Sequence, residues 1–564
     1  MRNWRPNLIL IFIILFGATI TGKLFFLQIL HHDFYSALAQ GQHIVFPEIK
    51  GDRGKIYLQD KDGNLYPLVI NKTEKLCFVF LKEINDKDGV AKILSETLNL
   101  DKEDLLSKFK KENANFLILK ENLTLQEIKN LEDLQSSIPG LHLADQKIRE
   151  YPYQDFASHL IGFVNKDGVG QYGIEQYYDE ILKGKEQFLE GERGPFGYLF
   201  FSNTEDLAGS DLILTVDYNI QFQAEKLLDK ARENLNIEGG QIVVMDPVSG
   251  KILALAHFPK FNPNLYFKEE LEIFNNGAIQ KLFEPGSIFK PITMAGALNE
   301  GKITPQTTYR DPGIIEIGGW PIYNYDHRVY PGEITMTEVL EKSINTGAVF
   351  AESQLGHQKF LEYIENFKIF EKTGIDLPGE IFSSNEEFKK GYEINFTTAS
   401  FGQGIAMNPL QLARAFCAIA NGGKIVKPYL VEKIKKNGKI IETQPEVQKK
   451  EVISPETSSK LTAMLISVVK GAFARRAQIP GYYIAGKTGT AQMPWSTLGE
   501  DRVGYSDKTW QSFIGYAPAF DPKFLILIKL DNPQTKTAEY SAVPIFQELA
   551  KYIIDYYQIP PDYE

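Results

Sequence analysis

The sequence predicts a multidomain α/β protein of the α+β kind. It comprises an N-terminal transmembrane helix, a mixed domain, and a C-terminal domain in which an antiparallel sheet meets a helical block. The chain has 564 residues, which is too long for a single hydrophobic core of ordinary size, so several folded units are expected. Its hydrophobic content of 43% and charged content of 24% are those of a folded chain. In its second half, strand patterns stand at both ends and helical patterns lie between them.

The first thirty residues predict the compartment. Arg2 and Arg5 precede an apolar stretch, residues 8–30, which as a helix covers roughly 34 Å against ~30 Å of bilayer hydrocarbon. No A-x-A site follows it, which favours an uncleaved anchor over a cleaved signal peptide. Positive charge ahead of the span places the N-terminus in the cytoplasm. We therefore expect residues 1–30 to be a cytoplasmic tip and a single-pass anchor in the inner (cytoplasmic) membrane, with the rest of the chain outside.

Residues 31–205 are predicted to form a noncatalytic domain of mixed structure. Strand-like runs such as LCFVFL (76–81) alternate with charged helical stretches such as residues 101–113. Residues 191–211 are rich in Gly and polar side chains, as is typical of a linking segment. No group of residues in this region indicates catalysis.

Residues 206–564 are predicted to form the domain with the antiparallel sheet. LILTVD (212–217) predicts a strand, a helix to about residue 235 follows, and QIVVMD and KILALAHF flank PVSG as a β-hairpin. PLQLARAFCAIANGG (409–423) predicts a helix ended by two glycines. IAGKTGTAQ, SFIGYAP and FLILIKLD predict consecutive strands. Strands at both ends around helices indicate an antiparallel sheet with a helical block.

The charge and the rare residue types exclude several kinds of site. A formal charge of -11 argues against nucleic acid as a partner, because affinity for phosphate depends on clustered Lys and Arg. Cys77 and Cys417 stand far apart and outside any C-x-x-C or Cys/His pattern, so we expect both to be buried small hydrophobes. The eight histidines are scattered along the chain. No metal ion and no cofactor are therefore expected.

Ser287 is the first candidate functional residue. It follows a Pro-Gly pair, and a helical pattern of apolar residues begins directly after it. Lys290 stands one turn further along the same face, where its amine can reach the Ser287 hydroxyl. A helix N-terminus also offers free N–H groups and a positive dipole end, which suit an oxyanion. The S-x-x-K spacing alone is weak evidence, because Ser107 and Lys110 have it in a charged helix.

A second motif, Ser343-Ile-Asn345, stands in TEVLEKSINTGAVF. Its hydroxyl and amide could relay a proton and hold a substrate amide, or the serine could be a helix cap. A third motif, of Lys487, Thr488, Gly489 and Thr490, lies on a predicted strand. Gly489 would let a substrate backbone approach, and Lys487 with Thr488 could hold a carboxylate; the alternative is a turn.

S-x-x-K, a Ser/Asn motif and K-T-G in this order are the set that penicillin-binding proteins and class A β-lactamases use, with serine as the nucleophile. For Lys290 to act as a base near neutral pH, its pKa must fall from ~10.4 toward ~7. Burial contributes to that fall, and the positive charge of Lys487 can lower the pKa of Lys290 further.

The whole chain resembles a class B penicillin-binding protein. The resemblance rests on the three motifs and on further stretches: GDRGKIY (51–57), residues 149–165, residues 168–184, GGQIVVMDPVSGKILALA, FEPGSIFKP and FGQGIAMNPLQLA (401–413). It implies a membrane helix, an elongated noncatalytic pedestal of the dimerisation type over residues 31–205, and a transpeptidase domain of the penicillin-binding/β-lactamase-like fold over residues 206–564.

The resemblance also implies a reaction. Ser287 would attack the penultimate D-Ala carbonyl of a peptidoglycan stem peptide, release D-Ala, and pass the acyl group to an amine of a neighbouring stem. The backbone N–H groups of Ser287 and Thr490 would form the oxyanion hole, and Ser343 and Asn345 would assist proton transfer. Thr488, Gly489 and Thr490 would bind substrate. β-Lactams would be trapped as substrate mimics.

The implied partners are lipid II-derived strands, a glycosyltransferase of the SEDS type, and membrane proteins of division or elongation. The FGQG stretch (401–404), with Gln411 in the next helix, favours the septal branch, although these four residues could simply be a buried helix junction. Gly277 and Asn408 depart from the family's usual residues.

An elongation-type transpeptidase, a D,D-carboxypeptidase and a noncatalytic β-lactam-binding scaffold stay open as alternatives. A β-lactamase would need an efficient deacylating group and would have no use for a pedestal. The acceptor amine, the identity of the glycosyltransferase, β-lactam sensitivity and the oligomeric state cannot be read from one sequence.

Overall fold

The computed structural model describes residues 14–21, 23, 49–110, 116–187 and 207–563. The chain divides into two compact units, Met1–Asp52 with Lys183–Gly209 and Arg53–Leu182 with Ser210–Glu564. The described elements of the first unit are a helix over residues 14–21 and the antiparallel pair β1 (Ile49–Lys50) and β8 (Glu186–Gln187).

No helix among the described residues is long and apolar enough to cross a membrane. Most of the predicted anchor, residues 8–30, lies outside the described residues, as does most of the predicted linking segment, residues 191–211. Both stay predictions.

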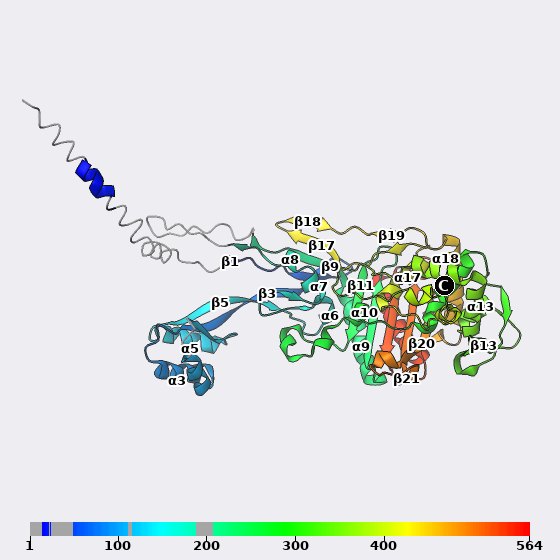
Figure 1. Ribbon diagram of the computed structural model, residues 1–564, viewed down its shortest axis with the longest axis horizontal. Helices are drawn as coiled ribbons and strands as arrows, with labels where there is room; N and C mark the ends of the chain where they lie inside the picture. Colours follow the sequence, from blue (N-terminus) through cyan, green and yellow to red (C-terminus); the bar gives the residue numbers. More distant parts are fainter. Residues whose placement is uncertain (1–13, 22, 24–48, 111–115, 188–206, 564) are drawn as a thin grey trace, which may run out of the picture. The chain divides into compact units, whose positions relative to one another are not determined.

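The second unit is built on a five-stranded antiparallel sheet with the order β11-β10-β22-β21-β20. Strands β11, β20 and β21 are labelled in Figure 1. Its strands are β10 (Gly239–Met245), β11 (Ile252–Phe258), β20 (Ala485–Pro494), β21 (Tyr505–Ala517) and β22 (Phe524–Asp531). The predicted hairpin and the three predicted C-terminal strands are therefore confirmed. The central strands are buried nearly throughout, which is why they read as continuous apolar runs. The K-T-G strand β20 is the last strand of the sheet.

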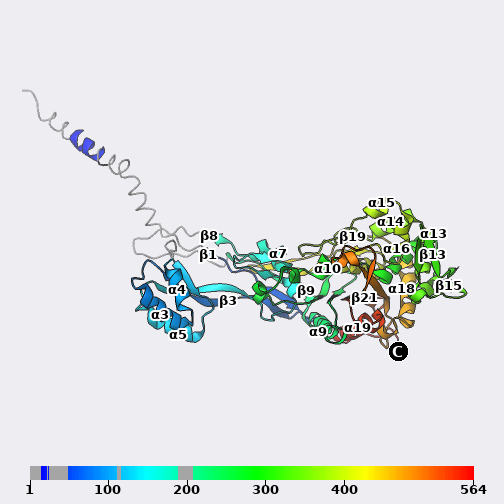
Figure 2. The ribbon, with the colours of Figure 1, turned by 60° about the horizontal axis from the view of Figure 1, so that its bottom comes forward.

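Helices cover both faces of this sheet. Alternation along β21 points Phe513 to one face and Tyr516 to the other. The ring of Phe513 packs on Phe546 of α19 (Ala542–Tyr557), 4.6 Å between centroids, beside α9 (Tyr218–Leu235) (Figure 2). The hydroxyl of Tyr516 pairs with Thr462 of α18 (Pro455–Lys470) at 2.8 Å.

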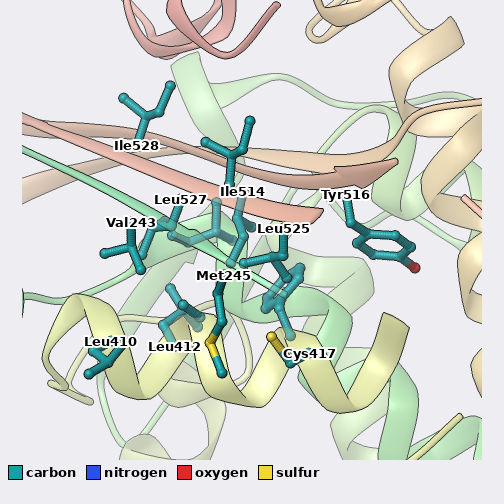
Figure 3. Close-up of a cluster of buried hydrophobic side chains, with 14 of the residues drawn as sticks. Val243, Met245, Leu410, Leu412, Cys417, Ile514, Tyr516, Leu525, Leu527 and Ile528 are labelled. Atoms are coloured by element: carbon teal, nitrogen blue, oxygen red, sulfur yellow. The ribbon is translucent and has the colours of Figure 1, made fainter. Parts of the chain in front are cut away.

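The second face also carries α17 (Pro409–Ala420), the helix predicted to end at two glycines. In Figure 3, Leu410, Leu412 and Cys417 of α17 lie against Met245 and Leu525 of the sheet. Cys417 is fully buried and unpaired. Cys77 is buried in the same way, so both cysteines are the small hydrophobes that were expected.

A helical block packs beside the sheet. Its helices are α11 (Lys290–Asn299), α12 (Met336–Glu341), α13 (Asn345–Leu355), α14 (His357–Asn366), α15 (Glu386–Lys389) and α16 (Glu393–Ala399). Nine of the ten residues of α11 are buried, so this helix is a core helix rather than an amphipathic one. Ser287 lies in the 3-10 turn η5 (Gly286–Phe289), and the α-helix proper begins at Lys290. The helix predicted after Ser287 is thus present, with a 3-10 turn as its entry.

A second, mixed sheet has the order β18-β17-β9-β2-β3-β4, with β5 also paired to β3. Its strands are β2 (Ile56–Gln59), β3 (Leu65–Phe80), β4 (Phe116–Lys120), β5 (Leu141–Glu150), β9 (Asp211–Asp217), β17 (Val431–Lys436) and β18 (Lys439–Glu442). Strands from residues 31–205 and from residues 206–564 share it, since β2 runs parallel to β9. The domain boundary at residues 205 and 206 stays a prediction, and the second unit contains parts of both predicted domains.

The far end of β3 has its own small core under three helices, α3 (Lys87–Leu98), α4 (Lys102–Phe109) and α5 (Leu125–Gln135). The strand predicted from LCFVFL is the end of β3. Of the charged helix predicted over residues 101–113, α4 is present with Asp101 as its N-cap and ends at Phe109, and residues 111–113 lie outside the described residues. The remaining short elements are α6 (Ser158–Ile161), β6 (Phe163–Val164), β7 (Gly170–Gln171), α7 (Gly173–Tyr177), α8 (Asp179–Leu182), η3 (Pro263–Lys268), η4 (Leu271–Phe274), α10 (Gly277–Gln280), β12 (Thr308–Arg310), β13 (Ile314–Ile317), β14 (Trp320–Tyr323), η6 (Tyr325–His327), β15 (Glu333–Thr335), β16 (Ile425–Val426), β19 (Val447–Lys449), η7 (Arg475–Ala477), η8 (Trp495–Leu498) and η9 (Ala538–Tyr540).

One buried carboxylate joins three of the N-terminal stretches that carried the resemblance. Glu175 is fully buried, and it accepts hydrogen bonds from Nε of Arg53 at 2.7 Å and from Nε of Arg149 at 2.7 Å. Asp179 pairs with Arg53 as well, also at 2.7 Å. A charge taken from water must be paired to be tolerated, and here each buried charge has an opposite partner.

Candidate active site

The three motifs found in the sequence meet at one cleft of about 730 Å³. Ser287 comes from η5, Ser343 and Asn345 from the junction of α12 and α13, and Thr488 and Thr490 from β20; all five line the cleft. Their separations along the chain are long, so the tertiary fold alone brings them together.

The turn that carries Ser287 is held by close backbone packing. Gly286 has a φ of 59°, and its N–H donates to the carbonyl of Gly402 at 2.9 Å. A Cβ on Gly402 would lie 2.1 Å from the Gly286 carbonyl oxygen, so only glycine fits there. Local packing therefore explains the FGQG stretch (401–404), because Gly402 supports the turn that carries Ser287, the nucleophile turn.

Gly489 brings β20 against the same turn. A Cβ at this position would lie 2.6 Å from Oγ of Ser512 and 2.9 Å from the carbonyl oxygen of Pro285. The sequence suggested that Gly489 leaves room for a substrate backbone. In the structure, the room left by the missing side chain is occupied by the protein's own atoms. It lets β20 lie close to the turn before Ser287.

Lys290 is completely buried, and its amine is bonded to the second motif. Nζ donates to the Ser343 carbonyl at 2.6 Å and to Oδ1 of Asn345 at 2.8 Å, and lies 3.3 Å from Oγ of Ser343. The S-x-x-K spacing predicts that this amine reaches Ser287. Among the described residues the Ser287 hydroxyl has no hydrogen-bond partner, and the contacts of Lys290 go to Ser343 and Asn345 instead.

Lys487 approaches the same hydroxyl from the other side. Its Nζ donates to Oγ of Ser343 at 3.0 Å and to the Thr488 carbonyl at 3.1 Å. The side chain is buried and is absent from the cleft lining, whereas Thr488 and Thr490 line it. Ser343 is therefore the hydroxyl that two amines share, and Thr488 and Thr490 are the residues of the third motif that line the cleft.

Both amines are held away from water without a carboxylate partner in the described part of the chain. Burial lowers the pKa of Lys290 well below its ordinary value, and the charge of Lys487 lowers it further. Burial also lowers the pKa of Lys487 to about 7. The effect of Lys487 on Lys290 has the direction expected from the sequence. A neutral amine near physiological pH, as a base requires, is a consequence of this burial.

Comparison with known proteins agrees with this geometry. The model of the penicillin binding protein transpeptidase domain matches residues 240–551, and that of the penicillin-binding protein dimerisation domain matches residues 48–212. The chain belongs to the class B penicillin-binding proteins. It is a serine-type peptidoglycan D,D-transpeptidase.

Individual relatives of this penicillin-binding protein span nearly all of it. Stage V sporulation protein D of Bacillus subtilis is 31% identical over 93% of the chain and 82% of that protein. Peptidoglycan D,D-transpeptidase FtsI of Escherichia coli K12 is 28% identical over 99% of the chain and 93% of that protein. The solved penicillin binding protein 3 of Mycobacterium tuberculosis, complexed with aztreonam, has the same fold, with a TM-score of 0.70 at 24% identity over 91% of this chain and 98% of that one.

Several sequence features of this penicillin-binding protein have purely local explanations. Ser107 lies on α4, where its hydroxyl donates to the Asp104 carbonyl at 2.8 Å, away from the cleft. Asn408 and Gln411 form the capping box of α17. A Cβ on Gly277 would lie 2.7 Å from Nε2 of His257, which accounts for that glycine.

A Glu-x-x-x-Asn spacing of the kind found in class A β-lactamases is present at Glu362 and Asn366. Both residues belong to α14, where Glu362 pairs with the exposed Lys359 at 3.0 Å. Neither residue lines the cleft. This pattern therefore does not supply a deacylating group at Ser287.

Sequence reasoning missed the residues that support Asn345, two of which, Tyr323 and Asn324, line the cleft beside it. Tyr323, Asn324 and Asp311 stand in a stretch without a recognisable motif, and the only local signal is an Asp followed two residues later by Gly, as in a turn. Their contacts are known only from the folded chain.

Ser343 places its hydroxyl between the two lysine amines and has a strained backbone. Its φ is 56°, at the end of α12, where its N–H bonds the Leu340 carbonyl and that of Ile344 bonds the Val339 carbonyl. This is the Schellman pattern, in which glycine is preferred. The helix-cap alternative and the functional hypothesis therefore apply to the same residue, one through its backbone and the other through its hydroxyl.

Ser343→Gly is expected to give a more stable protein than Ser343→Ala. Both changes remove the hydroxyl, but only glycine relieves the left-handed backbone, worth about 1 kcal/mol. Thermal unfolding of the two variants measures this difference, and both should lose acylation activity. A Gly variant that melts at or below the Ala variant would contradict the strain at this position.

Lys487→Met is expected to raise the melting temperature at pH 7 and to lose this advantage toward pH 10. The lowered pKa means that the unfolded chain binds more protons than the folded one between pH 7 and the ordinary lysine pKa, so wild-type stability rises with pH over that window. Methionine removes a burial cost on the order of a few kcal/mol, which is fully present below pH 7. Lys230→Met, at an exposed lysine paired with Glu548, is the control and should behave alike at both pH values.

Proposed function

We propose that this transpeptidase cross-links peptidoglycan stem peptides through an acyl-enzyme on Ser287. The observation that carries the proposal is the shared hydroxyl of Ser343, bonded by Lys487 and 3.3 Å from the amine of Lys290, in the cleft that Ser287 lines. A buried base, a proton relay and a nucleophile that lines the cleft are the parts that serine acylation needs.

In the first half-reaction, neutral Lys290 takes the proton of Ser287, directly or through Ser343. Oγ of Ser287 forms a bond to the penultimate D-Ala carbonyl carbon, and the N–H groups of Ser287 and Thr490 stabilise the oxyanion. The C–N bond then breaks, and the leaving D-Ala nitrogen receives a proton from the same relay. In the second half, an acceptor amine attacks the ester carbonyl carbon and gives a proton to the relay. The C–O bond to Ser287 then breaks, and Oγ of Ser287 takes that proton.

The shape of the third motif supports a peptide substrate. β20 is the last strand of its sheet, so its free backbone edge can pair with an extended peptide. Thr488 and Thr490 would bind the terminal carboxylate with their hydroxyls, and Lys487 behind them would add positive potential when protonated. β-Lactams would acylate Ser287 as substrate mimics, in keeping with the aztreonam complex of the Mycobacterium tuberculosis relative.

The cellular role is proposed as septal. The support is the FtsI relative; the FGQG stretch, which favours this branch in the sequence, is already accounted for by its packing against the nucleophile turn. The protein would be held in the cytoplasmic membrane by residues 8–30, with its catalytic part outside, and would work with a SEDS-type glycosyltransferase that supplies strands.

Intact mass spectrometry of the detergent-purified chain after incubation with a penicillin tests the acyl-enzyme. The wild type is expected to gain one stable adduct, and Ser287→Ala is expected to gain none. Ser107→Ala is the matched control, because it removes the other serine of S-x-x-K spacing, and it should keep the adduct. An adduct that persists in Ser287→Ala would refute the assignment, and rapid loss of a wild-type adduct would indicate a hydrolase.

A fluorescent fusion to the N-terminus tests the septal and membrane proposals together. The full chain is expected to form a ring at midcell, and a chain without residues 1–30 should be diffuse. Fluorescence spread along the side wall would favour the elongation branch, and diffuse fluorescence of the full chain would refute the anchor.

A further inference from the structure

The side-chain amide of Asn345 is held at both ends. Its Oδ1 accepts from Nζ of Lys290 at 2.8 Å, and its Nδ2 donates to the carbonyl of Tyr323 at 2.8 Å. A carbonyl oxygen can only accept a hydrogen bond. The Tyr323 carbonyl therefore determines which end of the amide faces the lysine.

The orientation of the Asn345 amide determines whether the lone pair of a neutral Lys290 amine stays free to accept a proton. A neutral amine has two N–H bonds and one lone pair. The Ser343 carbonyl at 2.6 Å and Oδ1 of Asn345 at 2.8 Å are both acceptors, so together they occupy both N–H bonds. The lone pair then remains for a hydroxyl proton. A reversed amide would donate an N–H into that lone pair, and the base would be occupied.

The residue that follows Tyr323 anchors this carbonyl to the start of α13. Asn324 is buried, and its Oδ1 accepts from the N–H of Thr346 at 3.1 Å. Thr346 is the direct neighbour of Asn345. Asn324 and Thr346 therefore link the end of β14 to the start of α13. Each is the direct neighbour of one of the two residues, Tyr323 and Asn345, whose contact orients the amide.

Asp311 completes the link with acceptor oxygens only. It accepts from the Thr346 hydroxyl at 2.7 Å, from Nδ2 of Asn324 at 3.0 Å and from the N–H of Tyr330 at 2.8 Å. Burial alone would raise the pKa of Asp311, but these hydrogen bonds, with that from the N–H of Gly313, lower it. The carboxylate is therefore charged, and its oxygens accept hydrogen bonds from the backbone of Gly313 and Tyr330 and from the Thr346 hydroxyl.

We propose that Asp311, Asn324 and Thr346 are positioning residues that orient the Asn345 amide and so leave the lone pair of Lys290 free for proton transfer. The inference rests on the proposed function of Lys290 as the base. None of the three residues hydrogen-bonds Ser287 in the described structure. Asp311 and Thr346 are absent from the cleft lining, and Asn324, which lines the cleft, is bonded to the N–H of Thr346, next to Asn345. All three therefore act through Asn345.

A purely structural role would have a different signature in the pH profile. If the network only kept the site packed, its loss would admit water, and the pKa of Lys290 would rise toward that of a free lysine, moving the acid limb of acylation to higher pH. If the network orients the amide, a reversed amide places an N–H donor against the amine. That disfavours the ammonium form and leaves the acid limb at the same or a lower pH, while the plateau rate falls.

The experiment is the second-order rate of acylation by a chromogenic penicillin between pH 6 and pH 10, on the full chain in detergent. Thr346→Val removes only the hydroxyl and keeps the shape of a residue that is fully buried, and Thr346→Ser restores the hydroxyl. We expect the Val variant to lose about tenfold or more of the plateau rate, a part of what a general base contributes. The acid limb should not move to higher pH, and the Ser variant should recover most of the rate.

Asp311→Asn is the stronger variant, because it places an amide donor against the donors of Asn324 and Tyr330. Its matched control is Asp376→Asn, at a buried carboxylate that accepts from the Tyr178 hydroxyl and from two backbone N–H groups far from the cleft lining. Both variants should melt lower than the wild type, but only Asp311→Asn should lose plateau rate.

The outcomes separate the two levels of the argument. A wild type that is not acylated overturns the proposed function, and this inference with it. A normally acylated wild type overturns the inference alone if Thr346→Val and Asp311→Asn match Asp376→Asn in rate, or if their acid limb moves to higher pH.

Discussion

Two buried amines that share one hydroxyl are the constraint on which the rest of the site depends. Lys290 and Lys487 both contact or approach Ser343, and no carboxylate compensates either of them in the described structure. Such a pair is tolerated only if a large, well-packed surrounding offsets the cost of taking the amines out of water. The nearly fully buried helix α11 and the sheet strand β20 provide that surrounding, because each carries one of the two lysines.

The same molecule treats buried charge in two ways. At Glu175 two arginines satisfy one carboxylate, and the result is a structural joint between distant stretches of the N-terminal part. At Ser343 two amines are buried without a carboxylate partner in the described structure, and burial lowers the pKa of both, with the charge of Lys487 lowering that of Lys290 further. The first arrangement suits stability and the second suits proton transfer, since a base must be able to lose and regain its proton.

Close approach of backbones provides the precision that the amines need. Gly286, Gly402 and Gly489 let the nucleophile turn, the FGQG stretch and β20 lie within contact distances that a side chain would forbid. Ser343 meets the opposite demand, because its hydroxyl is needed where its backbone would favour glycine. Strain of this kind persists where the surrounding structure holds the residue in place.

The sequence by itself determined the local elements and the chemical inventory. Period-two and helical patterns identified the strands around β10, β11 and β20 to β22 and helices α9 and α17, and the spacing of three short motifs identified Ser287, Lys290 and their partners. Only the tertiary structure decided which groups touch. That Lys290 bonds Asn345 rather than Ser287, that Gly489 makes room for the protein itself, and that Asp311 stands behind Asn345 are contacts between segments far apart in the chain. Local sequence patterns indicate the secondary structure of a segment and which of its faces is buried. Contacts between distant segments depend on how the whole core packs.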